Sequence, residues 1–262
     1  IWDKTMSRIL RSSDIEVQKI RELKRRIAGL SEHAEKMFMQ SIWGLVQALE
    51  AKDPYAKKHS ENVTRYALGI AETIRMGSKQ LEVIRRAAMI HDIGKIGIPD
   101  AVLSRPGTLT PHERKIIEQH PLIAVRILDK MSFLEQEIAI VRSHHEKWNG
   151  QGYPDGLANS AIPMGARILA VADTFDALTS TRSYHNPRPV AEAVKILVDS
   201  SGYDFDPKVV EALTLWIQKL RSRQNNADQL ILQDLLRSQT RIDHDSAANL
   251  TAETCAADGL FY

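Results

Sequence analysis

His91 and Asp92 are neighbouring residues of two types that commonly bind metal ions, and they stand in the sequence HDIGKIGIPD at 91–100. Apolar residues before the pair recur at helical spacing and glycines follow it, which predicts that the pair ends a helix. An imidazole and a carboxylate there can bind one ion together, or the carboxylate can bridge two ions. Lys95, in the loop that follows, could hold a phosphate group. An ordinary helix end often carries the same residue types, so both interpretations stay open at this point.

Four further histidines fall where predicted helices begin, end or face inward. His59 shares an apolar stripe with other residues of one helix, and His120 precedes the proline that is expected to start another. His144 and His145 end a third helix, which has an apolar inner face. A single inward-facing histidine is more often a core residue than a metal ligand, so none of these residues is decisive alone.

Asp173 is more informative, because it interrupts an otherwise apolar helical run at 167–178. A carboxylate on an apolar helix face is costly unless it is paired or bound to a metal. Five imidazoles and the two carboxylates of Asp92 and Asp173 suit two transition-metal ions in roughly octahedral sites better than one tetrahedral zinc. Asp176, one turn later, is expected either to support a ligand or to be a solvated charge, and we favour support. The spacing does not show whether these groups converge.

The composition excludes several classes of protein. The 262 residues carry a formal net charge of +2, which is too small to indicate binding to a nucleic-acid polymer. No run is apolar and long enough to predict a membrane span, and no secretory leader is recognised, so we expect a soluble segment that does not enter a membrane. The single cysteine, Cys255, lies far from every motif and fits a reducing cytoplasm. Because the sequence starts at Ile1, we expect it to be part of a longer protein.

Helical periodicity is frequent and alternating strand patterns are scarce, so the sequence predicts an all-α fold. Thr110 and Glu113 have the spacing of a capping box at the start of one helix. Two further helices are predicted at 190–198 and 207–220.

The N-terminal region differs from the rest of the chain. Apolar residues from Ile20 to Met37 recur at alternating steps of three and four, which is the pattern of a heptad repeat. We favour a parallel coiled coil that forms a homodimer and relays a signal from an upstream sensor or receiver domain. The alternative is a single amphipathic helix packed on the domain. The predicted organisation is a helical linker at 1–42, a catalytic domain at 43–221, and a C-terminal helix with a loosely ordered tail at 222–262.

Six motifs in a fixed order resemble those of a known family. They are DPYAKKHSENV at 53–63, HDIGKIGIPD at 91–100, QHP at 119–121, HHEKWNGQGYPDGL at 144–157, RILAVADTFDALTSTRSY at 167–184 and GYDFDP at 202–207. With this set, the chain resembles the HD-GYP family, a subgroup of the HD phosphohydrolase superfamily that degrades cyclic di-GMP. The ordered set is specific, whereas a lone HD or GYP would be weak evidence. The resemblance implies an HD-type helical bundle with a metal pair at its centre.

The resemblance also implies a role for each candidate residue. One metal ion would be held by His59, His91, Asp92 and Asp173, and the other by His120, His144 and His145, with Asp92 bridging the two. Lys95 would match the family's phosphate-binding lysine and Arg182 its substrate-gripping arginine, while Gly152, Tyr153 and Pro154 would form the loop beside the substrate. Asp92 and Lys95 would be the catalytic residues.

The implied reaction is the hydrolysis of cyclic di-GMP to linear pGpG by a hydroxide that bridges two metal ions. Further cleavage to GMP is left open. Mixed imidazole and carboxylate ligation suits iron or manganese, and zinc or nickel can occupy such sites after purification.

Four residues depart from the family pattern. Tyr55 stands where members with three metals carry a glutamate, so two metals are expected here. Asn149 replaces a common aspartate and keeps the turn chemistry. Ser183 and His185 stand where the family often has a proline and a basic residue, so part of the expected substrate-gripping surface is altered.

Three functions are compatible with the sequence. The preferred one is an active cyclic di-GMP phosphodiesterase. The second is a weakly active or inactive module that binds a cyclic dinucleotide and acts as a scaffold, with the GYP loop docking a GGDEF-domain cyclase. The third is an HD hydrolase of another cyclic dinucleotide.

Overall fold

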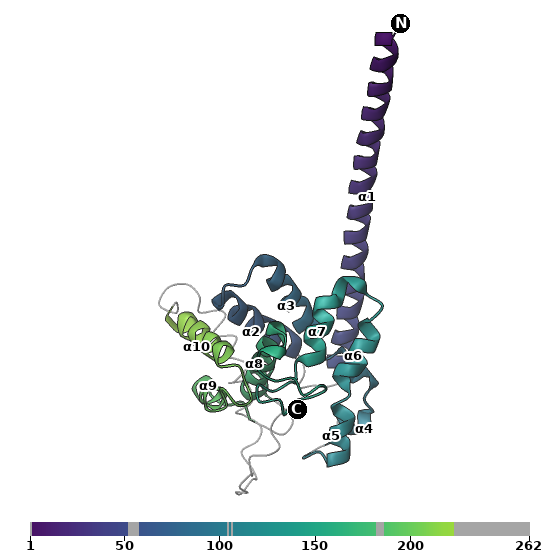
Figure 1. Cartoon of the computed structure of the whole chain (residues 1–262). Helices are drawn as coiled ribbons and strands as arrows, with labels where there is room; N and C mark the ends of the chain where they lie inside the picture. The colour runs from purple at the N-terminus through teal and green to yellow at the C-terminus, as the bar shows by residue number, and fades with distance from the viewer. Residues whose placement is uncertain (1, 52–57, 104, 106, 182–185, 223–262) are drawn as a thin grey trace, which may run out of the picture. The chain divides into compact units, whose positions relative to one another are not determined.

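The computed structural model describes residues 2–51, 58–103, 105, 107–181 and 186–222, with side chains from residue 18 onward. Every regular element in these ranges is a helix, so the predicted all-α fold is confirmed (Figure 1). Several sequence predictions fall outside the described residues: those for Tyr55, Arg182, Ser183 and His185, and those for the chain after residue 222.

The chain divides into two units, Ile1–Gly44 and Leu45–Tyr262. Helix α1 spans Trp2–Glu50 and supplies all the described residues of the first unit. Among the described residues, no helix combines the length and apolar character that crossing a bilayer requires. The domain boundaries expected at residues 42 and 221 stay a prediction.

Helix α8, which spans Met164–Thr179, packs against several of the longer helices of the second unit. The other longer helices are α2 (His59–Thr73), α3 (Ser78–Ile90), α6 (His120–Leu128), α7 (Glu135–Ser143), α9 (Val190–Asp199) and α10 (Pro207–Ser222). Shorter elements join them: η1 (Ile93–Gly97), α4 (Asp100–Leu103), α5 (Pro111–Ile117), η2 (Ser132–Leu134) and η3 (Asn159–Ala161). The helices predicted near residues 190 and 207 are therefore confirmed.

Helix α8 is central because most of its sides are apolar. Ile168, Leu169 and Phe175 are buried, and the helix contacts α2, α7, α9 and α10 (Figure 1). A helix that is hydrophobic nearly all round is stable only inside a core. Asp173 and Asp176 belong to this helix, so its packing brings two carboxylates into the interior of the bundle.

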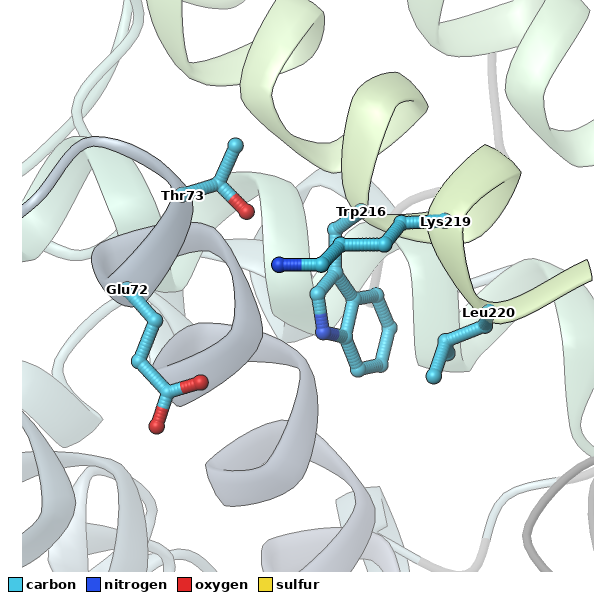
Figure 2. Close-up of a pocket in the computed structure, with 5 residues that line it drawn as sticks. All are labelled: Glu72, Thr73, Trp216, Lys219 and Leu220. Carbon is cyan, nitrogen blue, oxygen red and sulfur yellow. The ribbon is translucent and has the colours of Figure 1, made fainter. Parts of the chain in front are cut away.

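Helices α2 and α10 approach closely at a glycine. A Cβ atom on Gly69 would lie 2.1 Å from the Trp216 ring, so any larger residue would separate the two helices. Figure 2 shows a hollow beside this contact, lined by Glu72, Thr73, Trp216, Lys219 and Leu220. None of the predicted site residues lines it, so this hollow is separate from the candidate site.

The contact between η1 and α6 also depends on a glycine. A Cβ atom on Gly94 would lie 1.9 Å from the His120 carbonyl oxygen and 2.7 Å from the Ala124 nitrogen. Both neighbours are backbone atoms, which cannot move aside as a flexible side chain can. The absence of a side chain at this position therefore brings Asp92, which immediately precedes η1, next to His120 at the start of α6.

One polar contact joins two neighbouring helices, and another set caps a single helix. Arg86 on α3 donates through Nε to Glu137 Oε1 on α7 at 2.7 Å, and only 1% of the Glu137 residue is exposed. At the start of α5, the Thr110 nitrogen donates to Glu113 Oε2 at 2.8 Å, and the Glu113 nitrogen donates to Thr110 Oγ1 at 3.3 Å. The predicted capping box is thus confirmed.

Candidate metal centre

The predicted metal ligands lie together, although they come from distant parts of the sequence. His59 begins α2, His91 and Asp92 follow α3, His120 begins α6, His144 and His145 follow α7, and Asp173 lies within α8. Helix ends thus supply all of them except Asp173. Because each helix end points into the same volume, packing of the bundle creates the convergence that spacing alone could not show.

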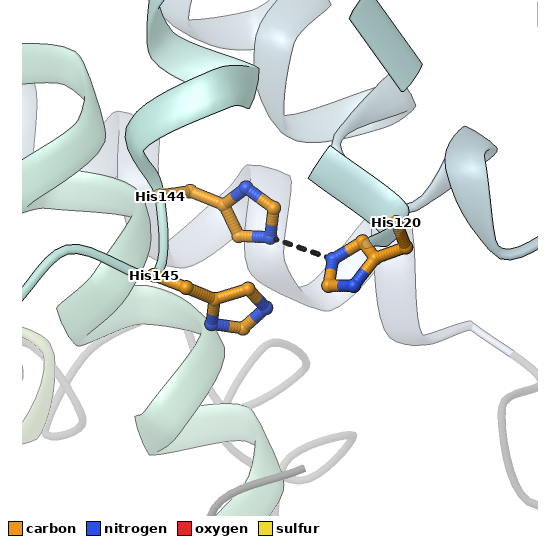
Figure 3. A group of neighbouring side chains, drawn as sticks. All are labelled: His120, His144 and His145. Carbon is orange, nitrogen blue, oxygen red and sulfur yellow. Dashed lines mark hydrogen bonds between the residues drawn. The ribbon is translucent and has the colours of Figure 1, made fainter. Parts of the chain in front are cut away.

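The ligand atoms form two principal clusters. His120, His144 and His145 each place a nitrogen within 4.8 Å of the others (Figure 3). The same limit holds for the ligand atoms of His59, His91 and Asp173. We call these sets the His120 cluster and the His59 cluster.

Asp92 lies between the two clusters, and each of its oxygens approaches a different cluster. Oδ2 is 3.6 Å from His59 Nε2 and 3.5 Å from His91 Nε2, whereas Oδ1 is 3.5 Å from His120 Nε2. Burial alone would raise the pKa of Asp92, but Lys95 and the surrounding histidines outweigh burial and hold this pKa well below its usual range. The carboxylate is therefore ionised, with one oxygen beside each cluster.

Backbone carbonyls orient three of the histidine rings. The Nδ1 atoms of His91, His120 and His144 lie 2.8, 2.8 and 2.6 Å from the carbonyl oxygens of the residues three positions earlier in the chain. A carbonyl can only accept, so each Nδ1 carries the proton and each Nε2 presents a lone pair. Within the described part of the chain, His91 Nε2 is buried without a hydrogen-bond partner.

The lone pairs of His120 and His144 face each other. Their Nε2 atoms lie 3.3 Å apart (Figure 3). Burial lowers the pKa of His120 to about 4 and that of His144 to about 3, so neither ring takes up a second proton near neutral pH. Two lone pairs at this distance repel each other, and a bound cation would convert that repulsion into attraction.

Asp176 supports His59 from the side of the ring that faces away from Asp92. Its Oδ2 accepts from His59 Nδ1 at 2.7 Å, and its Oδ1 accepts from Ser180 Oγ at 2.7 Å. Burial acts to lower the pKa of His59, but the hydrogen bond and charge of Asp176 outweigh it, so this pKa is raised. A carboxylate on the second ring nitrogen is the usual way in which proteins orient a metal-binding histidine.

Lys95 lies at the edge of the centre. Its Nζ donates to Asp92 Oδ2 at 2.7 Å, and 29% of its side chain is exposed. The ammonium group can therefore contact both the central carboxylate and a ligand that approaches from solvent.

The GYP loop contacts the His120 cluster directly. The Tyr153 ring stacks on His145, with the ring centroids 4.9 Å apart and the planes at 26°.

The sequence prediction did not include Glu146, which is only 3% exposed and accepts a hydrogen bond from the Asp155 nitrogen at 2.7 Å. Its place directly after His144 and His145 was the one available signal of its importance.

A family model described as HD domain matches residues 45–209. The chain belongs to the HD domain family. A Thermotoga maritima protein named cyclic di-GMP phosphodiesterase is 40% identical over 202 residues, which cover 74% of this chain and 55% of that protein. A Vibrio cholerae protein named 3′3′-cGAMP-specific phosphodiesterase 2 is 36% identical over 174 residues, which cover 66% of this chain and 33% of that protein. These relatives confirm the predicted HD-GYP membership, and the chain spans about half the length of the curated relatives that it matches first.

A solved structure supports the fold of this HD domain. It is a cyclic GMP-AMP-specific phosphodiesterase of Vibrio cholerae, with a TM-score of 0.56 and 21% identity. The match covers 76% of this chain and 53% of the other chain. At this level of identity the likeness shows the fold, which is the predicted HD-type helical bundle.

The side chains of this HD domain fit divalent metal ions. The described centre offers imidazole nitrogens with lone pairs together with the carboxylates of Asp92 and Asp173, and this donor set suits divalent transition metals. The buried and unpartnered Nε2 of His91 is the clearest sign, because a buried polar atom normally has a partner. The cluster is thus able to hold metal, as predicted.

Proposed function

We propose that this HD domain is a metal-dependent phosphodiesterase that hydrolyses cyclic di-GMP to linear pGpG. The observation that carries the proposal is the position of Asp92, whose two oxygens face the His59 cluster and the His120 cluster. The curated relative of Thermotoga maritima, named for this activity, supports the choice of substrate. Whether pGpG is cleaved further to GMP is left to product analysis.

The proposed centre holds two ions. His59, His91 and Asp173 would hold one with Asp92 Oδ2, and His120, His144 and His145 would hold the other with Asp92 Oδ1. Iron or manganese is the proposed native metal, because both accept mixed imidazole and carboxylate ligands. A pair of divalent ions supplies Lewis acidity and a nucleophile derived from water at neutral pH.

The chain's own residues contribute orientation and charge. Asp92 keeps its carboxylate ionised between the clusters, and Asp176 fixes the ring of His59. In-line attack on phosphorus increases negative charge on the phosphoryl oxygens, so a nearby cation lowers the barrier. We assign that role to Lys95, whose ammonium lies beside Asp92 and remains partly exposed.

The function is tested by product analysis with two substrates. Protein loaded with Mn²⁺ is incubated with cyclic di-GMP or with 3′3′-cGAMP, and the products are separated by chromatography. We expect pGpG to form, and Asp92→Asn to lose both activity and metal. Asp206→Asn is the matched control, because this buried carboxylate pairs with Arg167 and is not one of the proposed ligands.

Two outcomes would favour the other candidate functions. Faster turnover of 3′3′-cGAMP would assign the domain to a different cyclic dinucleotide, which the 36% identical relative makes the second candidate. Binding of cyclic di-GMP without turnover would indicate a receptor or scaffold, with the GYP loop as the proposed contact for a GGDEF-domain cyclase.

We further propose that α1 forms a parallel coiled coil with a second copy of the chain. Ile20, Leu23, Ile27 and Leu30 occupy the core positions of the heptad repeat and are 49–70% exposed. Such a row of exposed apolar side chains is expected to be covered by a partner. Light scattering at micromolar concentration should give a dimer for the wild type, and a monomer for the double variant with Leu23→Glu and Leu30→Glu.

The proposed input is an upstream sensor or receiver domain. We propose a cytoplasmic location for the protein, because the single cysteine fits a reducing compartment.

A further inference from the structure

The GYP loop is attached to the segment that carries two of the proposed ligands. Arg142 in the last turn of α7 donates to Asp155 through Nε and Nη2, both at 2.7 Å. Glu146 accepts from the nitrogen of the same aspartate at 2.7 Å. Asp155, which directly follows the loop, is thus tied to positions on both sides of His144 and His145.

Close backbone packing adds a second attachment. A Cβ atom on Gly152 would lie 2.3 Å from the Lys147 nitrogen and 2.4 Å from the Glu146 Cα. The loop therefore rests directly on the backbone that follows His145. This packing explains the glycine of the motif without any contact to a substrate.

Tyr153 occupies the position that these attachments fix. Its nitrogen donates to the His145 carbonyl oxygen at 3.3 Å, and its ring covers one face of the imidazole. The His144 ring lies against the same imidazole, with the centroids 4.0 Å apart. The His145 side chain thus contacts both of these rings.

His145 needs such support more than the other histidines of the centre. His91, His120 and His144 each have a backbone carbonyl on Nδ1, and His59 has Asp176 there. For His145, the described residues provide ring contacts and no hydrogen bond to the imidazole. Its orientation therefore depends on stacking.

We propose that the Gly152–Pro154 loop is a clamp that positions His145 for metal binding, with Tyr153 as the positioning residue and Glu146 as the anchor of the loop. This proposal rests on the proposed function, because it takes His145 to be a metal ligand. It changes the interpretation of the loop, which the sequence predicted to bind substrate.

The test measures metal binding without any turnover. Metal-free protein is titrated with Mn²⁺ by calorimetry, for the wild type and for Tyr153→Leu, Tyr153→Phe and Tyr203→Leu. Loss of a partner that orients a ligand typically weakens metal binding by about 10- to 100-fold. We expect a loss of about 10-fold for one ion in Tyr153→Leu and wild-type affinities in Tyr153→Phe, which keeps the ring. Tyr203→Leu is the control, because Tyr203 is a 58% exposed tyrosine outside the clamp, and its hydroxyl donates to Gln151 and not to a residue of the clamp.

A second variant separates a loss of His145 positioning from a general loss of folding. Arg142→Met removes a partly exposed anchor of Asp155 without deleting any of the stacked rings, so the loop is held less firmly and the affinity for the same ion should fall by a few-fold. Thermal unfolding checks that each variant is folded. If Tyr153→Leu and Arg142→Met bind both ions as the wild type does, and only the KM for cyclic di-GMP rises in Tyr153→Leu, the clamp is refuted and the phosphodiesterase stands. If the wild type binds no Mn²⁺, both proposals are wrong.

Discussion

Replacing Asp176 by asparagine is expected to weaken metal binding at the His59 cluster while leaving the fold intact. The carboxylate accepts from His59 Nδ1 and from Ser180 Oγ, each at 2.7 Å, and is only 1% exposed. Asparagine has nearly the same shape and can still accept one hydrogen bond, but it carries no charge. The His59 ring therefore becomes a weaker electron donor and loses part of its orientation.

The expected loss is about 10-fold in affinity for one of the two ions. Removing a partner that orients a metal ligand typically lowers metal affinity by about 10- to 100-fold. A tenfold change in affinity corresponds to about 1.4 kcal/mol. A hydrogen bond to a charged group contributes about 1.5–3 kcal/mol. Because asparagine retains one acceptor for His59 Nδ1, we place the effect at the lower end of that range.

The difference in metal affinity between the wild type and Asp176→Asn should become smaller as the pH falls. The hydrogen bond and charge of Asp176 outweigh burial and raise the pKa of His59, so protons compete with the ion in the wild type below that raised value. Removing the Asp176 charge lowers the His59 pKa and so reduces this competition. Calorimetric titrations with Mn²⁺ at about pH 8 and about pH 6, on either side of the ordinary histidine pKa, measure the difference.

Two matched variants separate this explanation from general damage. Ser180→Ala removes the other hydrogen bond of Asp176 but keeps its charge, so it should change affinity less than Asp176→Asn. Asp206→Asn removes a buried carboxylate that pairs with Arg167, so it should lower the melting temperature and leave both ions in place. Wild-type affinity for both ions in folded Asp176→Asn would refute the reasoning.

Three further predictions concern the same domain. Gly94→Ala should move η1 away from the start of α6 and cost at least one bound metal, because the new Cβ would lie 1.9 Å from the His120 carbonyl oxygen; elemental analysis with full metal content would contradict this. Arg86→Met should destabilise the fold by about 3 kcal/mol in urea titrations, because it leaves the buried Glu137 carboxylate unpaired. The melting temperature of the metal-free protein should fall as the pH is lowered from about 7 to about 5. The native state holds the pKa of His120 at about 4 and that of His144 at about 3, so the unfolded chain binds more protons in this pH range. A melting temperature independent of pH would count against this prediction.

The sequence predicted the ligand types and their local positions, and the structure explains why. Helix signals are local, so the proline after His120 and the glycines after Asp92 were enough to place these residues at helix ends. Convergence depends on how distant helices pack, which spacing does not encode. The facing Nε2 atoms of His120 and His144 became visible only when α6 and α7 were in place.

The contacts around the GYP loop were the part that sequence reasoning missed. Glu146 looked like one charged residue among many, because its burial depends on a loop that folds back over it. The Arg142 and Asp155 pair is likewise a contact between a helix and a loop, with no periodicity to reveal it. The family resemblance placed Gly152 in the loop beside the substrate, and the structure adds that this residue closely approaches the backbone of Lys147.

The single carboxylate of Asp92 between two histidine clusters makes the proposed metal binding cooperative in the thermodynamic sense. An ion held on one side would partly neutralise the carboxylate and restrict its rotation, so the other side would offer a ligand that is better ordered but less negative. The two binding free energies are therefore linked, and each ion changes the affinity for the other by the same factor. Under metal starvation, the fraction of fully loaded chains then depends on this coupling as well as on the two separate affinities, and differs from the product of two independent occupancies.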